Sequence, residues 1–342
     1  MNTSLTWVSW LVASLVILLS TRNPFLLCLI LILLLALGTR MTAPDNRKRW
    51  LGQNLRFIGT MLFLSSLINF IFTHSGNTAL FSLPKIWFLI GGPFTLESLI
   101  YGTINGLVIS SLYLTFTLLN KALSVEQLTR LIPNAFYPLT TIATISLSFF
   151  PSIQARTAQI KEAQMIRGNP MKKLSDWLPI LIPLMVTSLE NAVQLSESMT
   201  ARGFQTQTAG SRSSRPLVLL ILSTFLVFSG WILALFGYPN WISWTLYLIA
   251  FLGITFLFHS LSRKVNIVHL HMDHWTKADI VATLIFVLIT TLMIGLIITQ
   301  RTDFLTYNPY PTSKFPILPT SAWLLGLVPG LPLLFKVNHD HH

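Results

Sequence analysis

The chain alternates between long apolar runs and short polar stretches in which basic residues collect. A transmembrane helix needs about 20 predominantly apolar residues, with a range of about 17–25. Seven runs meet or approach this length, and they predict membrane-spanning helices at 4–20, 24–38, 55–72, 95–119, 216–236, 241–259 and 280–299. The pattern therefore predicts an all-α polytopic membrane protein with about seven transmembrane helices.

Two further apolar runs, at 136–150 and 178–189, are shorter and are edged or interrupted by proline. If both crossed the bilayer, the basic segment 152–177 would face the side opposite to the basic residues that flank the two runs. The positive-inside rule opposes that arrangement. We therefore expect that neither run spans, and that 121–215 is a large insertion on the cytoplasmic side.

The distribution of charge supports this topology. Of the 23 Lys and Arg residues, 18 fall in the segments 40–56, 120–215 and 262–279, which the topology places on one side. We expect that side, which also holds the N-terminus, to be the cytoplasm. The chain is then a multi-pass protein of the cell membrane, and it contacts membrane lipid. The predicted parts are N-terminal transmembrane helices (1–120), the cytoplasmic module (121–215), C-terminal transmembrane helices (216–300) and a proline-rich tail (301–342).

Composition excludes several classes of protein. Charged residues make up 10% of the chain, against about 25% in soluble globular domains. That deficit excludes a soluble enzyme, a disordered protein and a nucleic-acid-binding domain. The single cysteine, Cys28, allows no intramolecular disulfide. A phosphate-binding loop and the common hydrolase motifs are missing from the sequence, so we expect no catalytic residues and no bound cofactor.

Histidines gather in two places, at His269, His271 and His274 beside Asp273, and at His339, His341 and His342. A metal site needs converging ligands and a second shell that orients them. Spacing alone shows neither, so the favoured interpretation is a polar interfacial loop and a solvated tail, and no metal site is predicted.

A repeat lies inside the cytoplasmic module. The segment from Glu162 to Arg167-Gly168 recurs 35 residues later as Glu197 to Arg202-Gly203. Glycine after a last helical turn is a common stop signal, and arginine there complements the negative end of the helix dipole. One interpretation is therefore two ordinary capped helix ends. The other is two equivalent helix tips, each presenting a guanidinium to a partner carboxylate, which would suit a dimeric partner with two similar grooves.

An ordered set of motifs around this repeat resembles the transmembrane T component of energy-coupling-factor (ECF) importers, the CbiQ-type family. The resemblance covers about 110 residues strongly. It is carried by Gly92-Pro93-Phe94-Thr95-Leu96-Glu97, Tyr101-Gly102, Leu131-Ile132-Pro133, Phe149-Phe150-Pro151, Glu162-Ala163-Gln164 with Arg167-Gly168, Pro179 to Pro183, Ser188-Leu189-Glu190-Asn191-Ala192 and Ser198-Met199-Thr200-Ala201-Arg202-Gly203-Phe204.

The resemblance implies a non-catalytic subunit that joins two ABC-type ATPases to a small substrate-binding S subunit. In such importers two Ala-Arg-Gly motifs, at the ends of long cytoplasmic coupling helices, dock into the ATPases. Here the coupling helices would be 138–167 and 175–202, and the first motif departs from the pattern because Ile166 replaces the alanine. The implied docking residues are Arg167, Gly168, Ala201, Arg202 and Gly203, with Glu162, Glu190 and Glu197 in support.

Two alternatives stay open at the level of sequence. A permease of a conventional ABC transporter would have one coupling helix per chain and a substrate path within its own spans. A membrane scaffold or membrane-embedded enzyme would have no ATPase partners.

Overall fold

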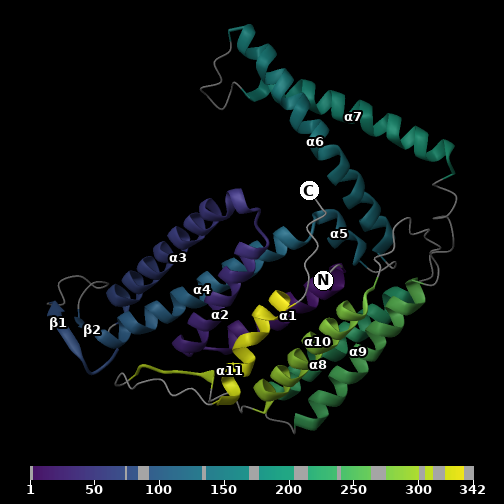
Figure 1. Cartoon of the computed structure of the whole chain (residues 1–342). Coiled ribbons are helices and arrows are strands. Elements are labelled where there is room, and N and C mark those ends of the chain that lie inside the picture. The colour runs from purple at the N-terminus through teal and green to yellow at the C-terminus, as the bar shows by residue number, and fades with distance from the viewer. Residues whose placement is uncertain are drawn as a thin grey trace. The chain divides into compact units, whose positions relative to one another are not determined.

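The computed structural model describes residues 3–73, 75–83, 92–132, 136–168, 177–203, 215–236, 240–262, 275–299, 305–310 and 320–334. The chain forms two compact units, of which the first contains 1–127 and 271–342 and the second contains 128–270. Figure 1 shows their elements, and each unit is described by itself.

The first unit is built from helices and one small hairpin. Its elements are α1 (Ser4–Ser20), α2 (Pro24–Arg40), α3 (Pro44–Phe72), β1 (Ala79–Leu83), β2 (Gly92–Thr95), α4 (Leu96–Ala122), α10 (Lys277–Ile298), α11 (Thr320–Leu327) and the 3₁₀ helix η5 (Val328–Leu334). The second unit contains α6 (Tyr137–Ile166), α7 (Leu178–Ala201), α8 (Arg215–Leu235) and α9 (Asn240–Ser262), and the short α5 (Val125–Arg130) lies at the boundary. The predicted all-α fold of a polytopic membrane protein is confirmed.

Local sequence signals start several of these helices. Asn23 caps α2, because its side-chain oxygen accepts a hydrogen bond from the Phe25 amide at 3.2 Å, and Pro24 occupies the first turn. Thr276 and Asp279 form a reciprocal capping box at the start of α10. Such caps satisfy backbone N–H groups that have no partner within the helix.

Six described helices have the length and composition of a membrane span: α3, α4, α7, α8, α9 and α10. Five of them match the predicted spans from 55–72 onward to within one residue or contain them. The predicted spans 4–20 and 24–38 lie in α1 and α2, which are 17 residues long, at the lower limit for crossing.

Helix α7 is the unexpected member of this set. The apolar run in the sequence covers only 178–189. The helix is not interrupted at Pro183, extends beyond the run and is 24 residues long. Helix α7 is therefore long enough to cross the membrane. The prediction that it stays on the cytoplasmic side now depends on the distribution of basic residues alone.

Helices α3 and α4 pack backbone against backbone through two glycines one turn apart, Gly102 and Gly106. A Cβ added at Gly102 would lie 2.7 Å from the carbonyl oxygen of Ser65, and one added at Gly106 would lie 2.9 Å from the Cα of Leu62. The Ser65 hydroxyl donates a hydrogen bond to the carbonyl of Gly102 at 2.8 Å. This is the close approach that small residues spaced four apart allow between membrane helices.

A two-stranded hairpin precedes α4 and was not predicted. Strands β1 and β2 pair antiparallel, and the rings of Phe81 and Phe94 stack with centroids 4.7 Å apart. Glu97, in the first turn of α4, is buried and accepts a hydrogen bond from the amide of Thr78 at 3.2 Å. The carboxylate therefore fastens the chain just before the hairpin to the start of α4.

The C-terminal helices of the first unit pack on its N-terminal helices. Helix α10 lies against α1, where the hydroxyls of Thr6 and Thr283 are 2.9 Å apart. The indole of the buried Trp10 donates a hydrogen bond to the carbonyl of Pro329 in η5 at 3.0 Å. Gly326 comes close to Leu26 of α2. The apolar segment ending in η5 thus belongs to the helical core, although prolines interrupt it.

We expect this contact to be trapped by cysteines. In a Cys28→Ser background, the pair Thr6→Cys/Thr283→Cys should form a disulfide on mild oxidation, because the two hydroxyl oxygens are 2.9 Å apart. The link is detected on denaturing gels after cleavage at a protease site inserted between α7 and α8. The pair Thr6→Cys/Leu288→Cys is the matched control, since Leu288 is 65% exposed. Equal cross-linking of both pairs would contradict the packing of α10 on α1.

Within the second unit, α8 and α9 form a closely packed antiparallel pair. Gly230 lies under the ring of Tyr247, and a Cβ at Gly253 would meet the hydroxyl of Ser223 at 3.0 Å. The outward faces of both helices are apolar and exposed, including Phe225 and Leu248, as expected for helices that face lipid.

Candidate functional site

The structure has two long helices at the positions expected for the coupling helices. The expected ranges were 138–167 and 175–202, and the structure has α6 at Tyr137–Ile166 and α7 at Leu178–Ala201. Each helix continues through an internal proline, Pro151 in α6 and Pro183 in α7. The two copies of the repeat are therefore the ends of two long helices. We call residues 162–168 the first tip and residues 197–203 the second tip.

The two tips have the same backbone geometry. The amides of Arg167 and Arg202 each donate to the carbonyl four residues earlier, both at 3.2 Å. Gly168 and Gly203 follow with φ values of +83° and +78°. This left-handed conformation carries little cost only for glycine. The prediction that glycine stops both helices is confirmed.

Both arginines are exposed at the ends of their helices. Within the part of the chain that the structure describes, neither Arg167 nor Arg202 makes a side-chain hydrogen bond or ion pair. The dipole at a helix C-terminus favours a positive charge there, but it uses none of the five guanidinium donors. Among the described residues, the guanidinium donors of both side chains are thus unused.

The other predicted residues are also on the surface. Glu162 and Glu197 lie on the last turns of α6 and α7, Glu190 lies near the middle of α7, and Ala201 is the last residue of α7; all four are exposed. Among the described residues, no ion pair joins these glutamates to the tip arginines. The site is therefore two separate tips and not one cluster.

The two helices cross at equivalent positions of the repeat. Arg156 donates a hydrogen bond to the side chain of Asn191 at 3.4 Å, and these residues are 35 positions apart, the same interval that separates Arg167 from Arg202. Farther along, Gln164 of α6 donates to the carbonyl of Pro179 at 3.4 Å, so the start of α7 lies beside the end of α6. The helices therefore run antiparallel with an approximate two-fold relation.

This arrangement separates the tips. The first tip lies beside the start of α7, and the second tip ends α7. A helix from Pro179 to Ala201 rises about 33 Å at 1.5 Å per residue. The two guanidinium groups are therefore held on the order of 30 Å apart, too far for a single small binding pocket to contain both.

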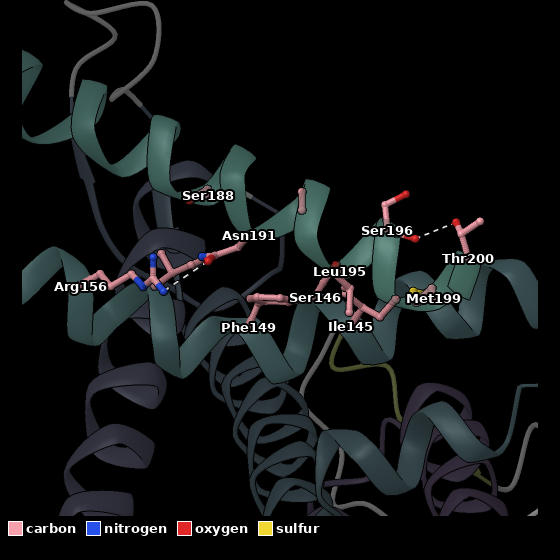
Figure 2. Close-up of a pocket in the computed structure, with 12 residues that line it drawn as sticks. Ile145, Ser146, Phe149, Arg156, Ser188, Asn191, Leu195, Ser196, Met199 and Thr200 are labelled. Carbon is pink, nitrogen blue, oxygen red and sulfur yellow. Dashed lines mark hydrogen bonds between the residues drawn. The ribbon is translucent and has the colours of Figure 1, made fainter. Parts of the chain in front are cut away.

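Figure 2 shows a groove between the two helices, with Arg156 reaching toward Asn191 near one end. Its volume is about 580 Å³. Apolar and hydroxyl side chains from both helices line it, among them Phe149, Ala192, Ser196 and Met199. The small residues Ala192 and Ser196 of α7 thus face this groove. The pairing of Arg156 with Asn191 had no signal in the local sequence, although the 35-residue repeat interval relates the two positions.

Residues 3–214 match the family CbiQ, described as "Cobalt transport protein". That match covers well over half of the 342 residues. The chain belongs to the CbiQ family. Both tips and the helices α6 and α7 lie inside the matched range, whereas α8, α9, α10 and α11 lie beyond it.

Several relatives of this CbiQ-family chain carry the name energy-coupling factor transporter transmembrane protein EcfT. The protein from Listeria monocytogenes (EcfT 1) is 29% identical over 164 residues, which are 42% of this chain and 58% of that protein. The protein from Acidaminococcus fermentans is 34% identical over 36% of this chain and 54% of its own length. The Bacillus subtilis protein is 29% identical over 46% and 62%, respectively. The chain thus spans little more than half the length of these relatives.

The histidines considered above as metal ligands lie outside the described residues. They are His269, His271, His274 and the group ending at His342.

The glycines that end the CbiQ-family tips offer a direct test of tip geometry. Replacing Gly168 by alanine should cost about 1 kcal/mol, because a residue with a Cβ is strained at positive φ. The last turn of α6 should then fray, and its amides should exchange hydrogen about fivefold faster in mass spectrometry. In Gly168→Asn the same amides should exchange hydrogen at a rate closer to that of the parent chain, since asparagine tolerates this conformation. Gly52→Ala in α3, where a Cβ meets open space, is the control. Unchanged exchange in Gly168→Ala would contradict the cap.

Proposed function

We propose that this chain is the membrane-embedded T component of an ECF-type importer. In this role it joins two ABC-type ATPases to a substrate-binding S subunit and hydrolyses no nucleotide itself. The observation that carries the proposal is the approximate two-fold relation of α6 and α7, which gives two equivalent, exposed arginine tips. A pair of two-fold related partners is the natural complement of such a helix pair.

Each tip arginine would bind a carboxylate in an ATPase groove. A guanidinium presents a planar fork of donors that matches a carboxylate bidentately. Because the tips lie on the order of 30 Å apart, each would occupy a groove of its own. Two tips in one chain favour this role over that of a conventional permease, which presents one coupling helix per chain.

The proposed orientation places the N-terminus and residues 121–215 in the cytoplasm. The basic residues of the module, including Lys161 and Arg167, are expected on the cytoplasmic side. The relatives are named energy-coupling factor transporter transmembrane proteins. These names support a transport role for this chain in the membrane.

The mechanism would transmit motion through the helix pair. Closure of the two ATPases on ATP would move both grooves, and the tips within them. Because α6 and α7 contact each other at Arg156 and Asn191, displacement of the tips changes the angle at which the helices cross. The exposed apolar faces of α7, with Leu181, Met185 and Leu189 at 50%, 56% and 64% exposure, would carry that change to the S subunit.

Affinity purification tests the proposal. The tagged chain, extracted from its native membrane in mild detergent, should bring down ABC-type ATPase subunits and a small membrane protein. The reconstituted complex should take up substrate only with ATP. A preparation that lacks ATPase subunits under conditions that preserve other membrane complexes would refute it.

A further inference from the structure

Three basic side chains from three helices of the first unit gather where α2 ends and α3 begins. Arg47 of α3 donates from Nε to the carbonyl of Thr39 at 2.9 Å. Lys121 of α4 donates from Nζ to the hydroxyl of Thr42 at 2.6 Å. Arg40, the last residue of α2, donates to a carbonyl of η5. We name Arg40, Arg47 and Lys121 the basic cluster.

Trp50 helps to position the ammonium group of this cluster. The Nζ of Lys121 lies 4.6 Å from the centroid of the Trp50 ring, a cation–π contact. The indole is 8% exposed and packs so closely on Gly38 of α2 that a Cβ there would clash with its ring. The Thr42 hydroxyl that accepts from Lys121 donates in turn to the Gly38 carbonyl at 2.6 Å. Contacts from both α2 and α3 therefore hold the ammonium in one place.

The carbonyl end of α2 balances only part of the charge of the basic cluster. A helix C-terminus carries the equivalent of about half a negative charge, whereas the cluster carries three positive charges. Among the residues that the structure describes, none of the three cations pairs with a carboxylate, that of Asp45 in the first turn of α3 included. Most of their N–H donors are likewise unused. The cluster can therefore accept an anion.

The basic cluster lies where membrane helices end and their apolar surface starts. Helix α2 ends at Arg40, and α4 ends one residue after Lys121. Leu55, eight residues or about 12 Å beyond Arg47 along α3, is 49% exposed. Phe116, about 7.5 Å before Lys121 along α4, is 45% exposed. Cations at the helix ends with apolar surface beyond them have the same order as the phosphate and acyl chains of a phospholipid.

We propose that the basic cluster binds the phosphate of an anionic phospholipid, whose acyl chains lie along α3 and α4. Guanidinium and ammonium groups recognise phosphate through charge-assisted hydrogen bonds, and basic pockets between membrane helices bind lipid head groups in this way. A lipid phosphate is favoured over an acidic protein segment, because phosphates line the membrane surface at which α2 and α4 end. The site goes beyond the proposed function. It needs no ATPase partner, so failure of that proposal would leave it standing.

A lipid titration of the full chain tests the site. The tagged chain is purified in a neutral detergent and titrated with phosphatidylglycerol, and native mass spectrometry measures the affinity for the first lipid bound. Arg47→Gln should lower this affinity about tenfold, because a hydrogen bond between charged groups is worth at least that factor. Arg49→Gln is the matched control. Arg49 is also exposed but makes no bond to the end of α2 among the described residues, so a change within about threefold is expected.

Variants of Lys121 test the second cation. Lys121→Met keeps the unbranched stem and should also lower the affinity about tenfold, whereas Lys121→Arg keeps the charge and the contact with Trp50 and should bind nearly as the parent chain does. The thermal midpoint without added lipid shows whether each variant is folded, and Arg47→Gln, at an exposed residue, leaves the packing of Lys121 intact.

Three results would overturn the inference. Equal losses in Arg47→Gln and Arg49→Gln would show diffuse attraction by a basic segment instead of a site. Equal affinity for phosphatidylcholine with the same acyl chains would show that the negative charge of the lipid is not recognised. Displacement of phosphatidylglycerol by an equal concentration of inorganic phosphate would show a site for free anions and not for lipid.

Discussion

The double variant Arg167→Glu/Arg202→Glu is expected to lose both ATPases on purification and to abolish ATP-driven uptake. Each guanidinium would lie against a carboxylate inside a partner groove, and breaking a buried charged pair costs about 2–5 kcal/mol. Reversing the charge adds repulsion between two carboxylates. Loss at both tips removes the two contacts through which the chain would hold its partners.

Two control variants make this prediction more specific. Lys161→Glu changes the charge of α6 by the same amount as Arg167→Glu, and Lys161 is also exposed, but it lies six residues before the arginine. It should leave co-purification nearly unchanged. Arg167→Lys/Arg202→Lys keeps both charges without the planar fork, so partial retention is expected. If the double glutamate variant retains its ATPases and its uptake, the tips are ordinary helix ends.

Gly102→Leu should unfold the first unit or prevent its assembly. An added Cβ would lie 2.7 Å from backbone atoms of Ser65 and Ser66, and a backbone cannot move aside as a flexible side chain can. Helices α3 and α4 would have to separate along much of their length, and the hydrogen bond from Ser65 to the Gly102 carbonyl would break. Overpacking typically costs about 1–3 kcal/mol, and the backbone clash places this site at or above the upper end.

The measurement is the thermal midpoint and the monodisperse yield in detergent. Gly59→Leu is a matched control on α3, because a Cβ at Gly59 meets nothing within 4 Å. It should be as stable as the parent chain. Gly106→Leu should behave as Gly102→Leu does, since its Cβ meets the Cα of Leu62 at 2.9 Å. Equal stability of Gly102→Leu and Gly59→Leu would contradict the packing of α3 on α4.

Much of the fold could be predicted because apolar length is itself the signal for membrane helices. The ends of α6 and α7 could be placed to within a few residues, since Arg-Gly after a helical stretch marks a stop, and Gly168 and Gly203 indeed have positive φ. Proline was the weaker guide. Pro151 and Pro183 lie inside continuous helices, because one lost hydrogen bond does not end a helix of this length.

The remaining features depend on which surfaces meet, and periodicity does not specify that. Nothing in the sequence pairs Thr6 with Thr283, or Trp10 with the carbonyl of Pro329, across most of the chain. The contact of Arg156 with Asn191 is likewise a property of the crossing. The close approach of α3 and α4 did have a signal, because Gly102 and Gly106 have the G-x-x-x-G spacing of paired membrane helices.

The contact of α10 and η5 with α1 has a consequence for the order of synthesis. A ribosome adds about 5–20 residues per second, so α1 is made roughly 15–50 s before α10 follows it. Throughout that interval the Thr6 hydroxyl and the Trp10 indole lack the partners that Thr283 and Pro329 later supply. The first unit therefore cannot complete its interior during translation of its own N-terminal helices. It closes only after the entire second unit has been synthesised.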